Sequence, residues 1–264
     1  MTGGPPCSTP VKPSRNVTLH LGTLQFSPLT SYAGGRLEAS SMPKTLGRRR
    51  FPRFEIHIPF LYTGSAPIST STGVGWTRSL SQGGATVELS ERLRPRTPIQ
   101  LRLRAPQAIA EAEAEVIWSG GPAREGGGLV HGLLFTRIAP DHMQVLREAC
   151  RPLVIMRHAG VRLPLEIPVT CRSKNLEGSQ LQGRTGNVNR GGLFLRLPRL
   201  LPPGTPLEVT LHTPEDPLTV DGGVVWVEPP EIWSPGESIG HGFQFHAPNW
   251  STLASLALLL LELS

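Results

Sequence analysis

From Phe54 onward, short runs of apolar or alternating residues are separated by Gly and Pro residues. Runs of this kind predict β-strands. In the first half they are Ile56–Tyr62, Val74–Arg78, Ala85–Leu89, Ile99–Arg104, Ala110–Trp118 and Val130–Arg137. In the second half they are Glu166–Cys171, Leu181–Asn187, Leu193–Leu197, Leu207–His212, Leu218–Val227 and Ile239–Phe245. The pattern therefore predicts six strands in each half of the chain.

A helical pattern follows each set of strands. The first helix is predicted to start at Pro140, with Asp141 in its first turn and apolar residues behind it at helical spacing. The second is predicted to run from about Pro248 to Leu263. Six short antiparallel strands would close into a barrel, because closure removes the exposed edges of an open sheet. We expect an all-β fold with terminal helices: two tandem six-stranded antiparallel barrels, each closed by a C-terminal helix.

The two halves repeat one another. Trp226 follows Trp118 by 108 residues, and His241 follows His131 by 110. This period is too long for a solenoid repeat, so it predicts a duplicated domain. The expected organisation is a leader over residues 1–45, a first domain over 46–152 and a second over 155–264. The leader is rich in Gly, Pro, Ser and Thr, so we expect it to be mostly disordered.

The net charge of +6 is concentrated in one segment. Six basic residues lie between Arg36 and Arg53 against one acid, Glu38, and the rest of the chain is nearly neutral. Aromatic residues make up only 6% of the chain, which argues against an extended groove or stacking platform for DNA or RNA. No DNA or RNA partner is therefore expected.

Three scattered cysteines are too few for a disulfide framework or a zinc site, which favours a reducing compartment. We expect no metal. No secretory signal is evident near Met1, and the apolar tail Leu253–Leu261 is shorter than a membrane span of about 20 residues. The chain is therefore predicted to be cytoplasmic, without a membrane span.

Two short motifs carry the candidate chemistry. The segment Arg49-Arg50-Phe51-Pro52-Arg53 has the form Arg-x-x-x-Arg, and the segment Ser79-Leu80-Ser81-Gln82-Gly83-Gly84 has the form x-x-Ser-x-x-Gly. Together with the strand order, they resemble the PilZ domain, the bacterial receptor module for cyclic di-GMP. That family has Asp or Asn where Ser79 stands. The resemblance implies cyclic di-GMP as ligand, no other cofactor, and a binding set of Arg49, Arg50, Arg53, Ser79, Ser81, Gly83 and Gly84.

These residue types suit such a ligand. Guanine offers O6 and N7 as adjacent acceptors for an arginine fork, and a guanidinium plane also stacks on a purine face. A reach around the ligand requires the arginines to sit on a mobile segment. The Ser81 hydroxyl and the amides near Gly83 and Gly84 would supply donors from the other side, where glycine permits close approach.

The second copy of the motifs is weaker. Arg157 and Arg162 match Arg48 and Arg53, but His158 replaces the arginine equivalent to Arg49. Its turn keeps Asn187 and Gly192, with Asn189 where Ser is expected. A neutral histidine lacks the planar fork of arginine. The set Arg157, Arg162, Asn187, Asn189 and Gly192 therefore predicts at most a weaker second site in a mainly structural or partner-binding domain.

Structural interpretations compete with these functional ones. A run such as Arg48–Arg50 is often only a solvated charge patch, and Ser-x-Gly-Gly is often only a hairpin turn. The repeated Trp118 and Trp226 predict core or rim packing. The repeated His131 and His241 could form a ligand pair, but a structural role is favoured because each begins a strand.

No catalytic motif is evident, so an enzyme is not expected. The leading hypothesis is a tandem PilZ protein whose first domain senses cyclic di-GMP and transmits that state to a protein partner. The alternative is a pair of degenerate domains that bind no nucleotide and act as an interaction scaffold. General nucleic-acid binding through the basic segment is a weaker third interpretation.

Overall fold

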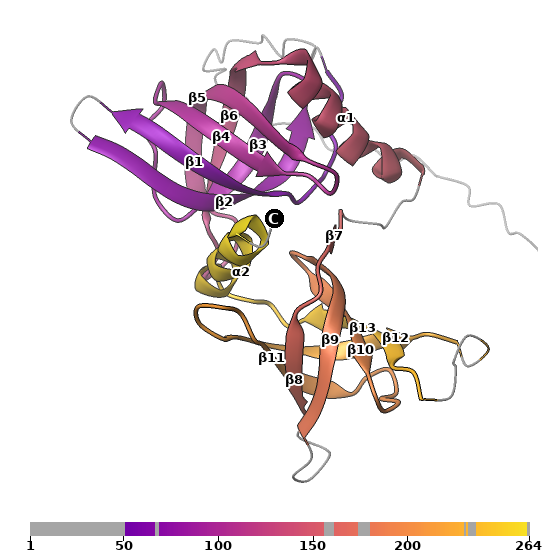
Figure 1. Cartoon of the computed structure of the whole chain (residues 1–264). Coiled ribbons are helices and arrows are strands. Elements are labelled where there is room, and N and C mark those ends of the chain that lie inside the picture. Colours follow the sequence, from indigo (N-terminus) through magenta and orange to yellow (C-terminus); the bar gives the residue numbers. More distant parts are fainter. Residues whose placement is uncertain are drawn as a thin grey trace, which may run out of the picture. The chain divides into compact units, whose positions relative to one another are not determined.

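Two β-barrels follow one another along the chain in the computed structural model (Figure 1). The structure describes residues 51–66, 69–155, 161–173, 180–229, 231 and 236–262. All of these belong to one unit, Arg48–Ser264. The predicted leader lies outside the described residues. The same holds for four residues of the two arginine motifs: Arg49, Arg50, Arg157 and His158.

The first barrel has six antiparallel strands in the closed order β1-β2-β3-β6-β5-β4. They are β1 (Pro59–Ala66), β2 (Ser69–Ser81), β3 (Gly84–Leu89), β4 (Pro98–Arg104), β5 (Ile109–Pro122) and β6 (Leu129–Ile138). Period-two alternation places Ile99, Leu101 and Leu103 of β4 inside, while Gln100 and Arg102 point outward. Helix α1 (Pro140–Ile155) adds Leu146, Ala149 and Cys150 to this core.

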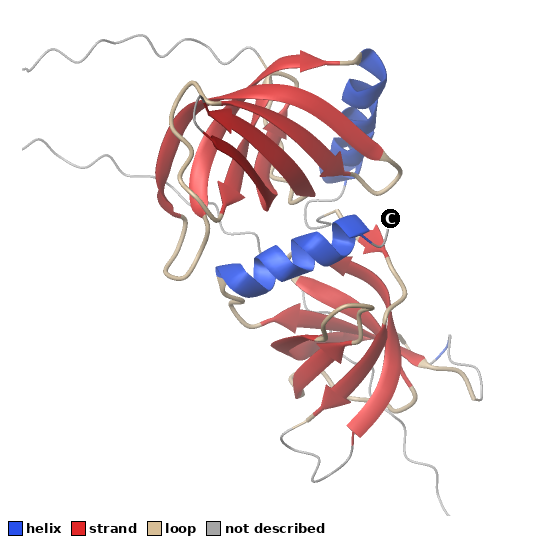
Figure 2. Cartoon of the chain, turned by 60° about the vertical axis from the view of Figure 1, so that its left-hand side comes forward, coloured by secondary structure: helices blue, strands red, loops and turns tan. Residues whose placement is uncertain are grey.

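The second barrel repeats the arrangement. Its six strands pair in a closed ring: β8 (Pro168–Arg172), β9 (Gln180–Asn189), β10 (Gly192–Leu197), β13 (Ile239–Phe245), β12 (Leu218–Val227) and β11 (Pro206–Leu211), which returns to β8. A short extra strand, β7 (Leu163–Pro164), pairs with β9. Strands dominate both halves, with the helices α1 and α2 (Trp250–Glu262) beside them (Figure 2). The predicted fold class is confirmed.

The strands differ from their predicted lengths. β2 begins at Ser69, not Val74, because its polar and glycine-containing first half still pairs with β1 from Ala66 opposite Ser69 to Pro59 opposite Trp76. A side chain at Gly75 would lie 2.5 Å from the Phe60 ring, so this glycine makes room for a core aromatic. β7 was not predicted, since two residues carry no recognisable periodicity.

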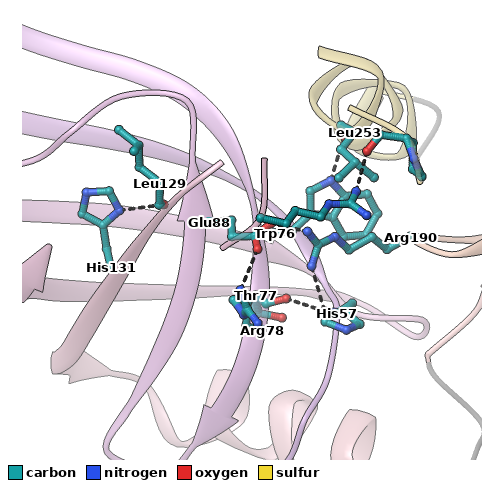
Figure 3. Close-up of polar contacts among 11 residues, drawn as sticks. His57, Trp76, Thr77, Arg78, Glu88, Leu129, His131, Arg190 and Leu253 are labelled. Carbon is teal, nitrogen blue, oxygen red and sulfur yellow. Dashed lines mark hydrogen bonds and ion pairs between the residues drawn. The ribbon is translucent and has the colours of Figure 1, made fainter. Parts of the chain in front are cut away.

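Helix α2 does more than close its own barrel. Its side chains Leu253, Leu256, Ala257, Leu259 and Leu260 are buried, as expected for a helix that is apolar around most of its circumference. α2 contacts β12 and also β1 and β2 of the first barrel. Trp76 of β2 packs within the core cluster of the second barrel, and its Nε1 donates a hydrogen bond to the Leu253 carbonyl at 2.7 Å (Figure 3). Neither described helix is long and apolar enough to cross a membrane.

Candidate functional site

Arg53 is held beside the first barrel by a short backbone bridge. The Phe54 and Leu80 amides each donate to the other residue's carbonyl at 2.9 Å, which ties the segment before β1 to β2. From there the Arg53 guanidinium donates to the Thr86 hydroxyl on β3 at 2.9 Å. The predicted arginine and the β2–β3 hairpin therefore meet on the outer face of the barrel.

The predicted Ser-x-x-Gly element forms the turn between β2 and β3. The Ser81 hydroxyl donates to the Gly84 carbonyl at 3.0 Å, which closes the turn. A Cβ on Gly84 would lie 2.0 Å from the Leu133 carbonyl oxygen of β6, so only glycine fits there. Gly83 faces the Phe51 ring, with a hypothetical Cβ 3.0 Å away. In this structure the turn serves hairpin geometry.

A row of four residues crosses the outer face of the first barrel. Ser79 pairs with Thr86, Thr86 pairs with Gly132, and Gly132 pairs with Trp118. A Cβ on Gly132 would lie 1.9 Å from Trp118 Nε1, so the indole lies over this glycine. We call these four residues the first row. The first row and Arg53 bring together a guanidinium group, the hydroxyls of Ser79 and Thr86, and the indole of Trp118.

β-Bulges create the first row. Alternation from Ala112, Ala114 and Val116 would point Trp118 into the core, but a bulge between Val116 and Trp118 turns it outward, and its side chain is 44% exposed. A second bulge, between Thr77 and Ser79, puts Ser79 outside. Of the predicted core or rim packing of Trp118 and Trp226, core packing is wrong, since both are exposed and lie over outer-face glycines. Trp118 lies in the candidate site beside Thr86 and Ser79, where the sequence did not place it.

The second barrel carries an equivalent row in which two aromatic rings stack on each other. Asn187, Phe194, Gly242 and Trp226 pair in the same order, and we call them the second row. Phe194 stands where the first row has Thr86. Its ring stacks on Trp226, with centroids 5.7 Å apart and planes 16° apart. On this barrel the indole already packs against a protein ring, although Trp226 remains 42% exposed.

The polar residues of the second motif are also engaged. Arg162 donates to Asn187 Oδ1 at 3.1 Å, and the guanidinium carbon of Arg196 lies 5.3 Å from the Phe194 centroid. Asn189 Oδ1 accepts a hydrogen bond from the Gly191 amide at 2.9 Å, so it closes its own turn. A Cβ on Gly192 would lie 2.1 Å from the Phe243 carbonyl oxygen, as in the first copy.

The repeated histidines hold loops in place. His131 Nε2 accepts from the Leu93 amide at 3.1 Å. Its Nδ1 donates to the Leu129 carbonyl at 3.0 Å (Figure 3). His241 does the same with Leu201 and Ile239. Both rings are fully buried, and burial lowers the pKa of each. The neutral tautomer with a proton on Nδ1 satisfies both bonds, and the favoured structural role is confirmed.

A repeated threonine plays a similar part and was not predicted. Thr77 Oγ1 accepts from the Ile58 amide at 2.8 Å, and Thr185 Oγ1 accepts from the Ile167 amide at 2.9 Å. Each hydroxyl also donates to a backbone carbonyl, that of Ile56 or Leu165. These bonds hold the segment before each barrel against β2 or β9. The signal was available, since the two threonines lie 108 residues apart, like the tryptophans.

Metal binding and thiol chemistry find little support in the described part of the chain. It contains no group of three or more His, Cys, Asp or Glu side chains that could hold a metal ion. Burial raises the pKa of the Cys150 thiol to about 11 and that of Cys171 to about 12. Neither thiol is therefore activated as a nucleophile at neutral pH.

The chain was compared with known proteins. It is similar in structure to the inhibitor of motility MotI/DgrA of Bacillus subtilis, at 10% identity and a TM-score of 0.33 over 79% of this chain and 97% of that one. It is also similar to YcgR from Escherichia coli in complex with c-di-GMP, at 12% identity and a TM-score of 0.33 over 78% and 83%. Curated proteins gave no match. The sequence model of the PilZ domain matches residues 47–151 and 157–261. These two matches span most of the chain, which therefore belongs to the PilZ domain family and carries the domain twice.

Proposed function

We propose that the chain is a non-enzymatic receptor that binds cyclic di-GMP on the first barrel and passes this state to a protein partner in the cytoplasm. The observation that carries the proposal is the first row with Arg53 beside it. The binding set is Arg49, Arg50, Arg53, Ser79, Ser81, Gly83 and Gly84, to which we add Thr86 and Trp118.

Each part of this surface suits one part of the ligand. The arginine forks would engage guanine O6 and N7 or the phosphates, because their planar donors match paired acceptors. The exposed indole of Trp118 would stack on a guanine, an interaction worth about 1 to 3 kcal/mol per base. The Ser79 and Ser81 hydroxyls would donate between these two ends. Ser81 would have to turn from the Gly84 carbonyl that it bonds in this structure.

The second barrel is proposed to be mainly structural. Phe194 stacks on Trp226, and Asn187 and Asn189 already have protein partners. A purine on the second row would have to share the indole of Trp226 with the ring of Phe194. This supports assigning the nucleotide to the first barrel.

The ligand-bound state would be passed to a partner through the segment before β1, which carries the arginines. A ligand held by Arg49, Arg50 and Arg53 would fix the segment before β1 against the barrel and change the surface offered to a partner. The second candidate function is an interaction scaffold without nucleotide. It is favoured by Ile117 and Leu134, large apolar side chains on the first barrel that are 48% and 47% exposed.

Calorimetric titration of the full chain with cyclic di-GMP tests the assignment to the first barrel. Arg53→Ala should weaken binding by about 1 to 3 kcal/mol, or roughly five- to over a hundred-fold. Lysine at position 53 should rescue poorly, because it keeps the charge but loses the fork. The matched control is Arg162→Ala, the equivalent position in the second barrel, which should change the affinity little.

A larger loss in Arg162→Ala than in Arg53→Ala would move the site to the second barrel. If the wild-type chain gives no heat at high micromolar ligand, the scaffold takes the place of the receptor.

A further inference from the structure

A pocket with a volume of about 370 Å³ lies apart from the first row. It is lined by residues of both barrels, among them Arg78 on β2, Glu88 on β3, Arg124 between β5 and β6, and Arg190 on the β9–β10 turn. Neither Arg53 nor any first-row residue lines it. Arg190 takes the place that Gln82 has in the first motif, so the turn of the weaker copy faces this pocket.

The guanidinium groups around this pocket outnumber the carboxylates. Glu88 is 2% exposed and pairs with both Arg190 and Arg78, the latter at 3.0 Å (Figure 3). Arg124 donates to the Pro248 carbonyl, which carries no charge. Three guanidinium groups therefore face one carboxylate among the lining residues.

The excess positive charge is partly shielded from water. Burial lowers the pKa of the Arg190 guanidinium, Glu88 opposes that shift, and Arg124 and Arg78 add to it. His57, which also lines the pocket, adds no further positive charge, since partial burial lowers its pKa and favours the neutral ring. An anion with several oxygens would relieve this repulsion and accept hydrogen bonds from arginines that approach from different elements.

We propose that this pocket binds a diphosphate anion, free or carried by a nucleotide, between Arg78, Arg124 and Arg190. Arg78 and Arg124 belong to the first barrel and Arg190 to the second, so the bound anion would stabilise the contact between the two barrels. This site is independent of the proposed cyclic di-GMP site, because it shares no residue with it.

Titration of the full chain with inorganic pyrophosphate, in phosphate-free buffer at constant ionic strength, tests the proposal. Arg124→Gln removes one guanidinium and leaves the Glu88 pairs intact, so it should fold normally, which circular dichroism checks. Its affinity for pyrophosphate should fall at least about tenfold, the scale of one charge-assisted hydrogen bond. The matched control is Arg137→Gln, an exposed arginine on β6 that pairs with Glu113 outside the pocket and should leave binding unchanged.

Arg53→Ala separates this site from the cyclic di-GMP site and should also keep pyrophosphate binding. Equal binding by all variants, or no binding by the wild-type chain, would overturn the proposal, as would loss in Arg53→Ala alone. A guanosine diphosphate titration then separates the two sources: tighter binding than pyrophosphate assigns the site to nucleotides, and weaker binding assigns it to the free anion.

Discussion

At the residue scale, one substitution between the copies distinguishes the two outer faces. Thr86 offers a hydroxyl to Arg53 beside Trp118, whereas Phe194 stacks on Trp226. The arginines and the turn predict that the first copy is the stronger binder. The structure adds a second difference between the copies, at a position outside both motifs.

Thr86→Phe should therefore create on the first barrel the stacked pair of aromatic rings that the second barrel has. The new ring would stack on Trp118 and compete with the guanine for the indole, with a loss of about 1 to 3 kcal/mol in cyclic di-GMP binding. Because Thr86 is on the outer face, the fold should persist. Calorimetry measures the loss, and the reverse change Phe194→Thr is the control, which should not weaken binding. Unchanged affinity in Thr86→Phe would remove Trp118 from the site.

Buried histidines make stability depend on pH. Burial lowers the pKa of His131 and His241 below the ordinary value of about 6.5. Below pH 6.5 the unfolded chain gains protons that the folded chain does not, so the stability present above that pH is lost as the pH falls. The free energy of unfolding in urea should decrease from pH 7 to pH 5.5 and be nearly flat from pH 7 to pH 8. A rise on acidification would contradict the neutral assignment of these rings.

At the scale of elements, the hydrophobic pattern predicted the order and number of the main strands, because each barrel strand alternates or runs apolar between Gly and Pro residues. It missed the first half of β2, where backbone pairing continues through small residues. It could not predict the first row, because the row joins four residues from four strands through pairing registers that bulges shift. Strict alternation places Trp118 inside, and only the bulged geometry shows that it is exposed.

The β2–β3 turn depends on the close approach of β6 to Gly84. Gly84→Ala would place a Cβ 2.0 Å from the Leu133 carbonyl oxygen and should destabilise the fold by about 1 to 3 kcal/mol. Gly121→Ala on β5 is the matched control, since nothing lies within 4 Å of its Cβ, and its effect should stay within about 0.5 kcal/mol. Urea unfolding measures both. Equal effects would show that the approach of β6 at Gly84 is not a constraint.

At the scale of the whole molecule, contacts between residues far apart in sequence join the barrels. Trp76 donates to Leu253, and Arg190 pairs with Glu88 (Figure 3). Neither contact was predictable, because the partners lie about 100 residues or more apart and Trp76 has no counterpart among the repeated tryptophans. In the isolated first domain, Trp76 would lose its packing against α2 and the core of the second barrel. Single substitutions in the full chain therefore compare the two sites better than separate fragments would.

The buried ion pair between the barrels gives a direct prediction. Glu88→Ala leaves Arg190 partly buried without its carboxylate and should cost about 3 to 5 kcal/mol of stability. Glu113→Ala breaks the exposed pair with Arg137 and should cost at most about 1 kcal/mol. Chemical denaturation of both variants makes the comparison. A small effect in Glu88→Ala would mean that the contact between barrels adds little to stability.

The most direct measurement for the central claim is calorimetric titration of the full chain with cyclic di-GMP and, in the same buffer, with cyclic di-AMP. Adenine has a donor at N6 where guanine has the O6 acceptor, so an arginine fork cannot engage it in the same way. We predict saturable binding of cyclic di-GMP, at least about tenfold tighter than that of cyclic di-AMP, from the loss of one bidentate contact. Absence of cyclic di-GMP binding, or equal affinity for the two ligands, would contradict a guanine-reading site built on Arg53 and the first row.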